Sequence, residues 1–399
     1  MKILVVDQHF YPEQFRINDI CFELVKQGHD ITILTGLPNY PKGKLFKGYR
    51  FFRKRKETYK GVKIKRTSII CRGKSVLRMG INYASFAINA SIKAIFMKKD
   101  FDIVYVYQTS PVSMAWPAIV VAKMKHIPLV IHILDQWPIS IASGGISKEG
   151  LLYKWMYKIS KNTYKKADVL SISSKKFEKY IKEELKITDI PIIYNPSYAE
   201  DTYKDTKITN NKKFDLLFAG NIGPATSVDT IVEAANILKN NKDIMFHIVG
   251  DGLTKEECLK KANDYNLTNI KFYGFCTVEE VKKYYDLADA FLITMDDNEV
   301  VNNTLPAKLQ SYMVAAKPIF GAVSGEAKET IIESKCGLVV SSKDYKGLAK
   351  LIEDNYKKDL SKYGKNALKY YKEHFEKDKC LNDMIDMFNN CIKEKNNEK

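Results

Sequence analysis

The feature that most constrains the fold is an alternation between short apolar runs and segments with helical spacing, sustained along most of the 399 residues. The apolar runs are rich in β-branched residues and leave no polar face, which is typical of strands buried on both sides. Strands of that kind, separated by helices, form parallel sheets covered by helices. A composition of 45% apolar and 28% charged residues excludes a disordered or low-complexity chain.

A polar segment at residues 200–213 interrupts the alternation, and we interpret it as a linker. Strands are predicted before it at residues 2–6, 30–34, 62–67, 102–107, 129–134, 169–173 and 191–194, and after it at residues 215–219, 245–249, 270–273, 290–294, 318–322 and 337–340. We expect a first domain over residues 1–199 and a second over 214–375. A final helix at 376–399 is expected to pack back on the first domain.

The predicted fold class is therefore α/β, with two Rossmann-like doubly wound domains facing a central cleft. In such sheets ligands bind beyond the carboxyl ends of the strands, so the residues that follow each strand are the first functional candidates.

The seven cysteines include no CxxC pair, which argues against a zinc ribbon and suits a reducing cytosol. The first residues, MKILVVD, indicate a buried strand rather than a signal peptide. The longest charge-free run, residues 103–122, has a polar, proline-broken centre, so we expect no membrane span there.

The net charge of +17 is concentrated in one stretch. From Lys42 to Arg78 there are fifteen lysines and arginines but one acid, Glu57. Nucleic acid, an anionic membrane surface, an extended anionic ligand and a plain solvated face are the alternatives that this pattern leaves open.

Two glycine turns follow predicted strands of the second domain. Gly220, Asn221 and Gly223 come after residues 215–219, and Gly250 and Asp251 come after residues 245–249. Turns of this kind, followed by a helix, present free backbone N–H groups to an anion, although one glycine after a strand is more often only a structural turn.

The densest functional candidate is the segment NNTLPAKLQSYMVAAKPIF, residues 302–320. Pro306 suits the first helical position, which places Lys308 in the first helical turn. A cation is disfavoured at that end of a helix, so the position of Lys308 suggests a functional role, and binding of a diphosphate is one that fits its charge.

This segment resembles the donor-nucleotide helix of GT-B glycosyltransferases of family 4. YPEQFRINDI, DQWP, FAGNIG and IVGDG are also similar to that family, and the whole set resembles its bacterial cell-surface polysaccharide branch, with the L-fucosamine transferases of O-antigen or capsule synthesis. The resemblance covers most of the chain.

The resemblance implies a retaining transfer of a sugar, a HexNAc or deoxy-HexNAc, from a nucleotide sugar. The family favours UDP as the nucleotide of that donor. It implies a nucleotide site in the second domain, an acceptor site in the first, and no metal cofactor. The acceptors of this branch are glycans on a membrane-bound polyprenyl diphosphate.

The chain departs from the family at its two motif glutamates. Ser311 stands where the ribose-binding glutamate belongs, and Asn303 stands where the glutamate facing the donor sugar belongs. Ser311 can replace the former as a neutral hydrogen-bonding partner. Glu299 and Glu326 are the candidates to replace the latter, and Glu326 is favoured because it follows Gly325 after a strand. An ordinary surface glutamate is the plain alternative for each.

In the first domain, Asp135 ends the strand at 129–134 and is the candidate catalytic carboxylate, to accept the acceptor's proton or support an oxocarbenium-like charge. The other acceptor candidates are Glu13, Arg16, Asn18 and Trp137. A turn-capping Asp135 and a core Trp137 are the plain alternatives.

With a lipid-linked acceptor, the basic stretch predicts peripheral contact with the inner face of the cell membrane. Arg53, Lys54, Arg55 and Lys56 are its candidate residues, with five aromatic residues between Phe46 and Tyr59 and the uncharged stretch 79–92 beside them. We expect a cytoplasmic, peripherally associated enzyme that binds no nucleic acid. A nucleotide-sugar 2-epimerase and a non-catalytic nucleotide-sugar- or nucleic-acid-binding protein are the alternatives.

Overall fold

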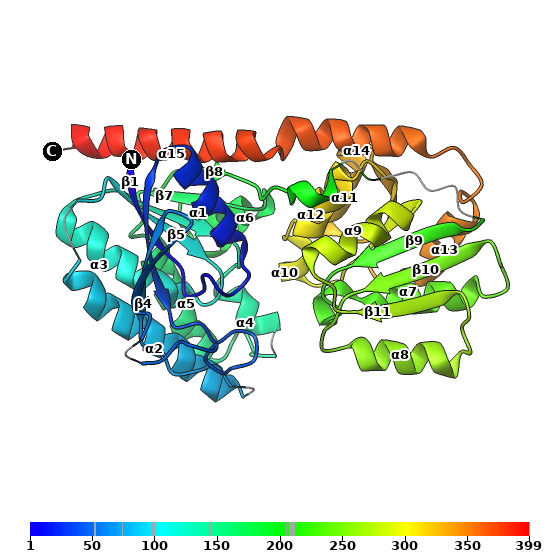
Figure 1. Cartoon of the computed structure of the whole chain (residues 1–399), viewed down its shortest axis with the longest axis horizontal. Helices are drawn as coiled ribbons and strands as arrows, with labels where there is room; N and C mark the ends of the chain where they lie inside the picture. Colours follow the sequence, from blue (N-terminus) through cyan, green and yellow to red (C-terminus); the bar gives the residue numbers. More distant parts are fainter. Residues whose placement is uncertain are drawn as a thin grey trace. The chain divides into compact units, whose positions relative to one another are not determined.

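The computed structural model describes residues 1–51, 53–73, 75–97, 100–143, 145–204, 206 and 212–398. The chain forms two compact units. One contains Met1–Asn195 and the residues from Leu381 onward, and the other contains Pro196–Cys380 (Figure 1). Of the predicted linker, residues 205 and 207–211 lie outside the described part of the chain.

The first unit is built on an eight-stranded sheet in the order β3-β4-β2-β1-β5-β6-β7-β8. Its strands are β1 (Lys2–Val6), β2 (Asp30–Gly36), β3 (Lys56–Tyr59), β4 (Val62–Thr67), β5 (Ile103–Gln108), β6 (Leu129–Ile133), β7 (Val169–Ile172) and β8 (Ile192–Tyr194). Neighbours pair in parallel, except that β3 pairs antiparallel with β4 at the edge. The sequence analysis missed β3 because its four residues, KETY, lie inside the basic stretch and are not apolar.

Helices cover this sheet on both faces, as the apolar strands require. They are α1 (Arg16–Lys26), α2 (Val76–Ile95), the short η1 (Val112–Ala115), α3 (Trp116–Lys125), α4 (Ile139–Ser143), α5 (Leu151–Tyr164), α6 (Lys176–Lys179) with η2 (Tyr180–Glu184), and α15 (Lys377–Asn397). The helical spacing of the sequence predicts a helix from residue 82, but α2 begins six residues earlier, at Val76, because Ser75 caps it by accepting a hydrogen bond from the Arg78 amide.

The second unit has a six-stranded parallel sheet in the order β11-β10-β9-β12-β13-β14. Its strands are β9 (Phe214–Ala219), β10 (Ile244–Val249), β11 (Ile270–Gly274), β12 (Ala290–Thr294), β13 (Ile319–Ala322) and β14 (Gly337–Val340). Its helices are η3 (Asp201–Tyr203), η4 (Pro224–Thr226), α7 (Val228–Ile237), α8 (Lys255–Asp264), α9 (Val278–Leu287), α10 (Glu299–Asn302), α11 (Ala307–Val314), α12 (Gly325–Ser334), α13 (Tyr345–Glu353) and α14 (Ser361–His374). This order reverses direction between β9 and β12, the position at which doubly wound sheets bind ligands.

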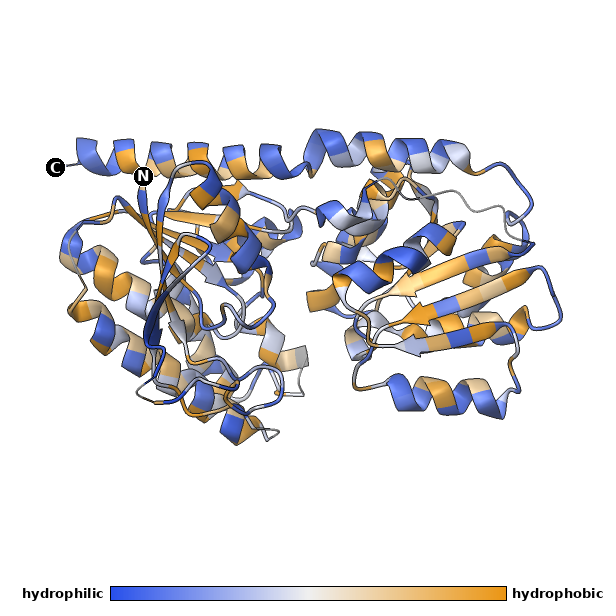
Figure 2. Cartoon of the chain, in the orientation of Figure 1, coloured by the Kyte–Doolittle hydropathy of each residue, from blue (hydrophilic) through white to orange (hydrophobic). Residues whose placement is uncertain are grey.

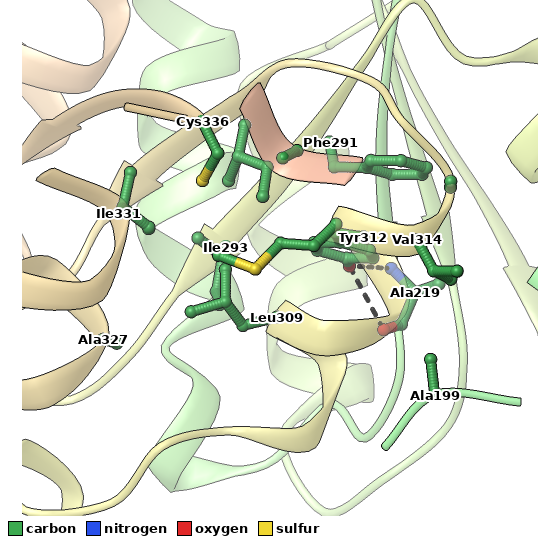
Figure 3. Close-up of a cluster of buried hydrophobic side chains, with 14 of the residues drawn as sticks. Ala199, Ala219, Phe291, Ile293, Leu309, Tyr312, Val314, Ala327, Ile331 and Cys336 are labelled. Carbon is green, nitrogen blue, oxygen red and sulfur yellow. Dashed lines mark hydrogen bonds between the residues drawn. The ribbon is translucent and has the colours of Figure 1, made fainter. Parts of the chain in front are cut away.

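The strands of both sheets are predominantly hydrophobic and the helices are mixed (Figure 2). In the second unit one buried cluster lies around Tyr312 of α11, whose ring stacks on Phe291 of β12 at 4.4 Å between centroids. The Tyr312 hydroxyl accepts a hydrogen bond from the Ala219 amide at 2.9 Å and contacts the Ala219 carbonyl at 3.3 Å (Figure 3). Helix α11 is therefore fixed to the carboxyl end of β9. The two doubly wound sheets confirm the predicted α/β class.

Candidate functional site

A pocket of about 400 Å³ opens in the second unit beyond the carboxyl ends of β9, β10 and β11. It is lined by Tyr203, Ala219, Gly220, Asn221, Val249, Gly250, Asp251, Phe275, Cys276, Thr277, Val278, Val281, Tyr285, Lys308 and Ser311. Six of the nine predicted donor residues line this pocket, so it is the candidate ligand site of this unit.

Close backbone approach explains the glycines of the pocket floor. Gly250 has φ +145°, and a Cβ added to it would lie 1.8 Å from the Gly220 carbonyl oxygen. Gly220 has φ +142°, and its added Cβ would lie 3.2 Å from the Lys308 ammonium nitrogen. Side chains at these two positions would separate the ends of β9 and β10 and fill the space beside Lys308.

The expectation of free amides in these turns is corrected by their hydrogen bonds. The Gly220 amide donates to the Val249 carbonyl at 2.9 Å, and the Gly250 amide donates to the Gly274 carbonyl at 2.8 Å. The Gly223 amide donates to the Thr226 hydroxyl at 3.1 Å. These groups are used to hold the turns together, because parallel ladders continue past the strand ends, so they are not available to an anion.

Lys308 supplies positive charge instead. Pro306 is the cap that precedes α11, one position earlier than predicted, and Lys308 is the second residue of the helix. Its ammonium nitrogen is buried without a hydrogen-bond partner and lies 3.8 Å from the centre of the Phe218 ring. Burial lowers the pKa of Lys308 to about 7. A buried, unpaired cation aimed into a pocket is costly unless a ligand completes it.

The polar rim of the pocket is formed by Asn221, Asp251 and Ser311. The Ser311 hydroxyl donates only a long hydrogen bond, 3.4 Å, to the Ala307 carbonyl. Asp251 is exposed and lies 3.5 Å from the Lys255 ammonium. A neutral hydroxyl and a solvated carboxylate at the mouth can bind hydroxyl groups of a ligand.

The loop after β11 also lines the pocket, and the sequence analysis missed it. Phe275 is 72% exposed, and Thr277 begins α9 with a reciprocal capping box to Glu280. The helix predicted at residues 278–287 is α9, and the Thr-Val-Glu-Glu sequence at 277–280 is the local signal that a capped helix N-terminus follows this strand end.

Three predicted donor residues, Gly223, Asn303 and Pro306, do not line the pocket, and neither does Glu326. Asn303 follows α10, and Pro306 serves as the cap of α11. Glu326 is 4% exposed in the first turn of α12. Burial raises the pKa of the Tyr370 hydroxyl, and the charges of Glu333 and Glu326 add to that rise. The role of a substitute for the missing glutamate is not supported by this position.

In the first unit, Asp135 follows β6 and accepts a hydrogen bond of 2.6 Å from the Ser110 hydroxyl. The same hydroxyl accepts a hydrogen bond of 3.0 Å from the Trp137 indole. Burial raises the pKa of the Asp135 carboxyl, and the Ser110 hydrogen bond partly offsets that rise. Asp135 thus has an elevated proton affinity, as a general base requires.

Two acceptor candidates are used inside the first unit. Glu13 is buried, contacts the His9 imidazole at 2.9 Å and accepts 2.6 Å hydrogen bonds from the Asn39 and Tyr40 amides. Asn18 accepts from the Tyr11 amide and donates to the Glu13 carbonyl. Both residues brace the loop after β1, and their contact with an acceptor stays a prediction.

The remaining first-unit candidates are Arg16 and the basic residues of 53–56. Arg16 begins α1 and lies 3.8 Å from Asp19. Arg53, Lys54 and Lys56 are exposed, but Arg55 donates hydrogen bonds to the Phe51 and Arg66 carbonyls and to the Ser68 hydroxyl. Arg55 is therefore a structural residue rather than a surface cation.

Within the described residues no three His, Cys, Asp or Glu side chains form a candidate metal site. No helix in the described ranges combines the length and the hydropathy needed to cross a bilayer.

Family comparisons match the chain in two parts. The description "Glycosyltransferase Family 4" matches residues 16–197, and "Glycosyl transferases group 1" matches residues 199–378. The chain is a GT-B glycosyltransferase of the group 1/family 4 type.

Individual relatives agree with this family. WcaI of Escherichia coli K12, named as a colanic acid biosynthesis glycosyl transferase, is 23% identical over 78% of this chain and 81% of its own length. WbjE of Pseudomonas aeruginosa, named as a glycosyltransferase, is 24% identical over 59% of this chain and 61% of its own. Among solved structures, Anabaena HepE in complex with UDP has a TM-score of 0.71 and 14% identity, covering 98% of this chain and all of that one. That likeness confirms the GT-B fold.

Proposed function

We propose that this glycosyltransferase of polysaccharide biosynthesis transfers a HexNAc or deoxy-HexNAc from a UDP-sugar to a polyprenyl-diphosphate-linked glycan of O-antigen or capsule, with retention. The observation that carries the donor half is Lys308, whose buried ammonium has no partner and points into a pocket at the ends of β9 and β10. A diphosphate is the ligand chemistry that compensates such a cation.

The lining of the pocket suits a nucleotide. We assign the diphosphate to Lys308 beside Gly220, the ribose hydroxyls to Ser311, and the base to the loop with Phe275 and Thr277. HepE has been solved with UDP and with UDP-glucose, which favours UDP as the donor nucleotide here. The two other residues of the polar rim, Asn221 and Asp251, then contact the donor sugar or the diphosphate.

Transfer forms a bond between the acceptor hydroxyl oxygen and the anomeric carbon, and it breaks the bond from that carbon to the diphosphate. The electron pair leaves with the diphosphate, where the charge of Lys308 stabilises it. The acceptor hydroxyl loses a proton, and Asp135, whose pKa burial raises, is the group we propose to accept it. No step of this scheme requires a metal ion.

Peripheral contact with an anionic membrane is part of the proposal, because the acceptor is lipid-linked. The exposed cations Arg53, Lys54 and Lys56 are expected to bind anionic headgroups. Reversing these three to Glu should abolish cosedimentation with phosphatidylglycerol vesicles and leave UDP binding intact. Arg55 is left unchanged, because its internal hydrogen bonds would be lost. Undiminished vesicle binding of the triple variant would contradict this part of the proposal.

The epimerase alternative is not favoured. It would require a histidine beside the donor sugar, and His247 is buried in β10, where it contacts Asp215 and Tyr273 at 2.7 Å each. That geometry is a satisfied core histidine, outside the pocket lining.

The experiment that tests the donor assignment is a thermal-shift comparison of UDP, GDP, dTDP and CMP with their sugars. UDP and a UDP-HexNAc should stabilise the protein, and transfer to a lipid-diphosphate glycan should follow with retention at the anomeric carbon. If no sugar nucleotide raises the melting temperature, the proposed function is wrong.

A further inference from the structure

The first unit contains a second cavity, distinct from the nucleotide pocket and larger. It measures about 590 Å³, within the roughly 300–1,000 Å³ typical of ligand pockets. It is bounded by α2 and α5, with η1 packed against both helices. The body of the groove is apolar, with Val76 and Ile88 from α2 and Leu152 and Trp155 from α5.

These apolar side chains remain exposed in the protein. Val76 is 73% exposed, Ile88 56%, Leu152 50% and Trp155 60%. Exposed aliphatic and aromatic side chains that converge on one concave surface mark a binding site rather than an incidental surface feature.

One end of the groove is polar. Arg72, Tyr83, Ser110 and Trp137 line it, and Ser110 donates to Asp135. The Arg72 guanidinium lies over the Tyr40 and Tyr83 rings at 5.4 and 5.8 Å, and in the described part of the chain no carboxylate forms a salt bridge with it. Burial raises the pKa of the Tyr83 hydroxyl, Arg72 opposes this rise and the charge of Asp135 adds to it.

We propose that this groove binds the first isoprene units of the acceptor's polyprenyl chain, with Arg72 at its diphosphate. The assignment rests on the proposed function. An apolar tail along α2 and α5 places an anionic headgroup at Arg72, by charge complementarity, and directs the attached glycan toward Ser110 and Asp135. The enzyme then recognises the lipid itself in addition to the membrane surface around it.

The three tryptophans of the chain make this testable without a label, because Trp116, Trp137 and Trp155 all line the groove. Farnesyl diphosphate, used as a short soluble isoprenoid diphosphate, should change the tryptophan fluorescence of the full chain saturably. Inorganic diphosphate should not reproduce the change. Farnesol should bind more weakly, by the contribution of Arg72.

A blocking variant and a matched control lie side by side on α2. Gly80 lines the groove, and a Cβ added there meets no atom within 4 Å, so Gly80→Phe should fill the groove without strain. We expect at least a tenfold loss of farnesyl diphosphate affinity. Ile81→Phe, at an exposed position outside the lining, should leave the affinity unchanged. Ala84→Phe, one turn further, is a second block, and Arg72→Gln should lower affinity for the diphosphate but not for farnesol.

Two results would overturn the groove assignment. One is farnesyl diphosphate binding that survives both Gly80→Phe and Ala84→Phe. The other is an equal fluorescence response to monomeric dihexanoyl phosphatidylglycerol, which would indicate a general lipid surface. The UDP thermal shift is measured on every variant. If the wild type shows a normal UDP shift but no response to farnesyl diphosphate, the groove assignment is wrong and the proposed glycosyltransferase function stands. If the wild type shows no UDP shift, the proposed function is wrong.

Discussion

Lys308 occupies a position that lowers the stability of the folded protein when no ligand is bound. Its ammonium nitrogen is buried against the Phe218 ring, with no hydrogen-bond acceptor. Desolvation of an unpaired cation opposes folding, and the low pKa of about 7 expresses the same cost. Residues that reduce stability in this way are typical of binding sites, where a ligand supplies the missing partner.

Replacing Lys308 with Met should therefore have opposite effects on stability and binding. At pH 6.5 the variant should melt at a higher temperature than the wild type, because a buried charge is replaced by an apolar chain of similar length. UDP should no longer raise its melting temperature. Lys362→Met, at an exposed lysine of α14, is the control and should change neither property. A variant that melts lower and still responds to UDP would contradict the role of Lys308.

The pH dependence of UDP binding follows from the same pKa. In the unliganded protein Lys308 loses its proton near pH 7, and a diphosphate beside it raises that pKa again. UDP binding at pH 8 should therefore take up a proton, and affinity should fall as the pH rises above 7. For stability the sign is opposite: between about 7 and the ordinary value of 10.5 the unfolded chain binds more protons, so the contribution of Lys308 to stability rises with pH.

Calorimetry in buffers of different ionisation enthalpy measures this proton uptake directly. Lys308→Met should show less uptake at pH 8 than the wild type if it retains measurable binding. Equal uptake by both proteins would assign the proton to another group.

A strand end followed by a glycine turn is a position that the sequence can place. Gly220, Gly250 and Lys308 line one pocket, since parallel strand ends converge at a sheet edge. The sequence could not show that Glu13, Asn18 and Arg55 hydrogen-bond to backbone groups of loops. Hydrogen bonds to distant backbone atoms leave no pattern in the sequence, so a bracing residue resembles a binding residue until the loops are placed.

At the scale of elements, α11 carries the site. It runs from Ala307 to Val314, with Pro306 as the cap before it rather than at its first helical position. Edge strand β3 and the first turn of α2 were missed, because a polar four-residue strand and a cap at Ser75 give weak local signals. The contact that orients α11, from Tyr312 to Ala219, is long-range and was not predictable from spacing.

Removing the Tyr312 hydroxyl should loosen this connection. Tyr312→Phe leaves the stacking on Phe291 but deprives the buried Ala219 amide of its acceptor, at a cost of about 1–3 kcal/mol in the free energy of unfolding. UDP affinity should also fall, because Lys308 and Gly220 lose their fixed spacing. Urea denaturation and UDP titration measure the two effects. Tyr265→Phe, whose hydroxyl contacts Glu233 at the surface, should cost less than about 0.5 kcal/mol. If Tyr312→Phe unfolds and binds UDP like the wild type, the Tyr312 hydroxyl does not position the site.

At the scale of the whole molecule, the sequence predicts two doubly wound sheets and a final helix that packs back on the first domain, but not the order of the strands within each sheet. Alternating strands and helices imply doubly wound sheets, because parallel strands require crossover helices. The structure adds that α15 begins in the second unit, where Lys377 contacts Asp201 at 2.8 Å. From Leu381 onward it belongs to the first unit. There Lys395 contacts Asp168 at 2.8 Å, and the buried Phe388 ring lies 5.2 Å from the Tyr105 ring of β5.

Residues near the end of the chain are therefore part of the core of the first unit. The unfolding of this unit can be followed separately by tryptophan fluorescence, because every tryptophan lies in it. Phe388→Ala should destabilise it by about 3–5 kcal/mol, since both Phe388 and Tyr105 are fully buried. The urea midpoint of the tryptophan-monitored transition should fall accordingly, while folded protein should still bind UDP. Asn389→Ala, at the next and exposed position of α15, should leave the midpoint in place. An unchanged midpoint for Phe388→Ala would mean that α15 does not contribute to this core in solution. Farnesyl diphosphate binding by the first unit would then have to be independent of α15.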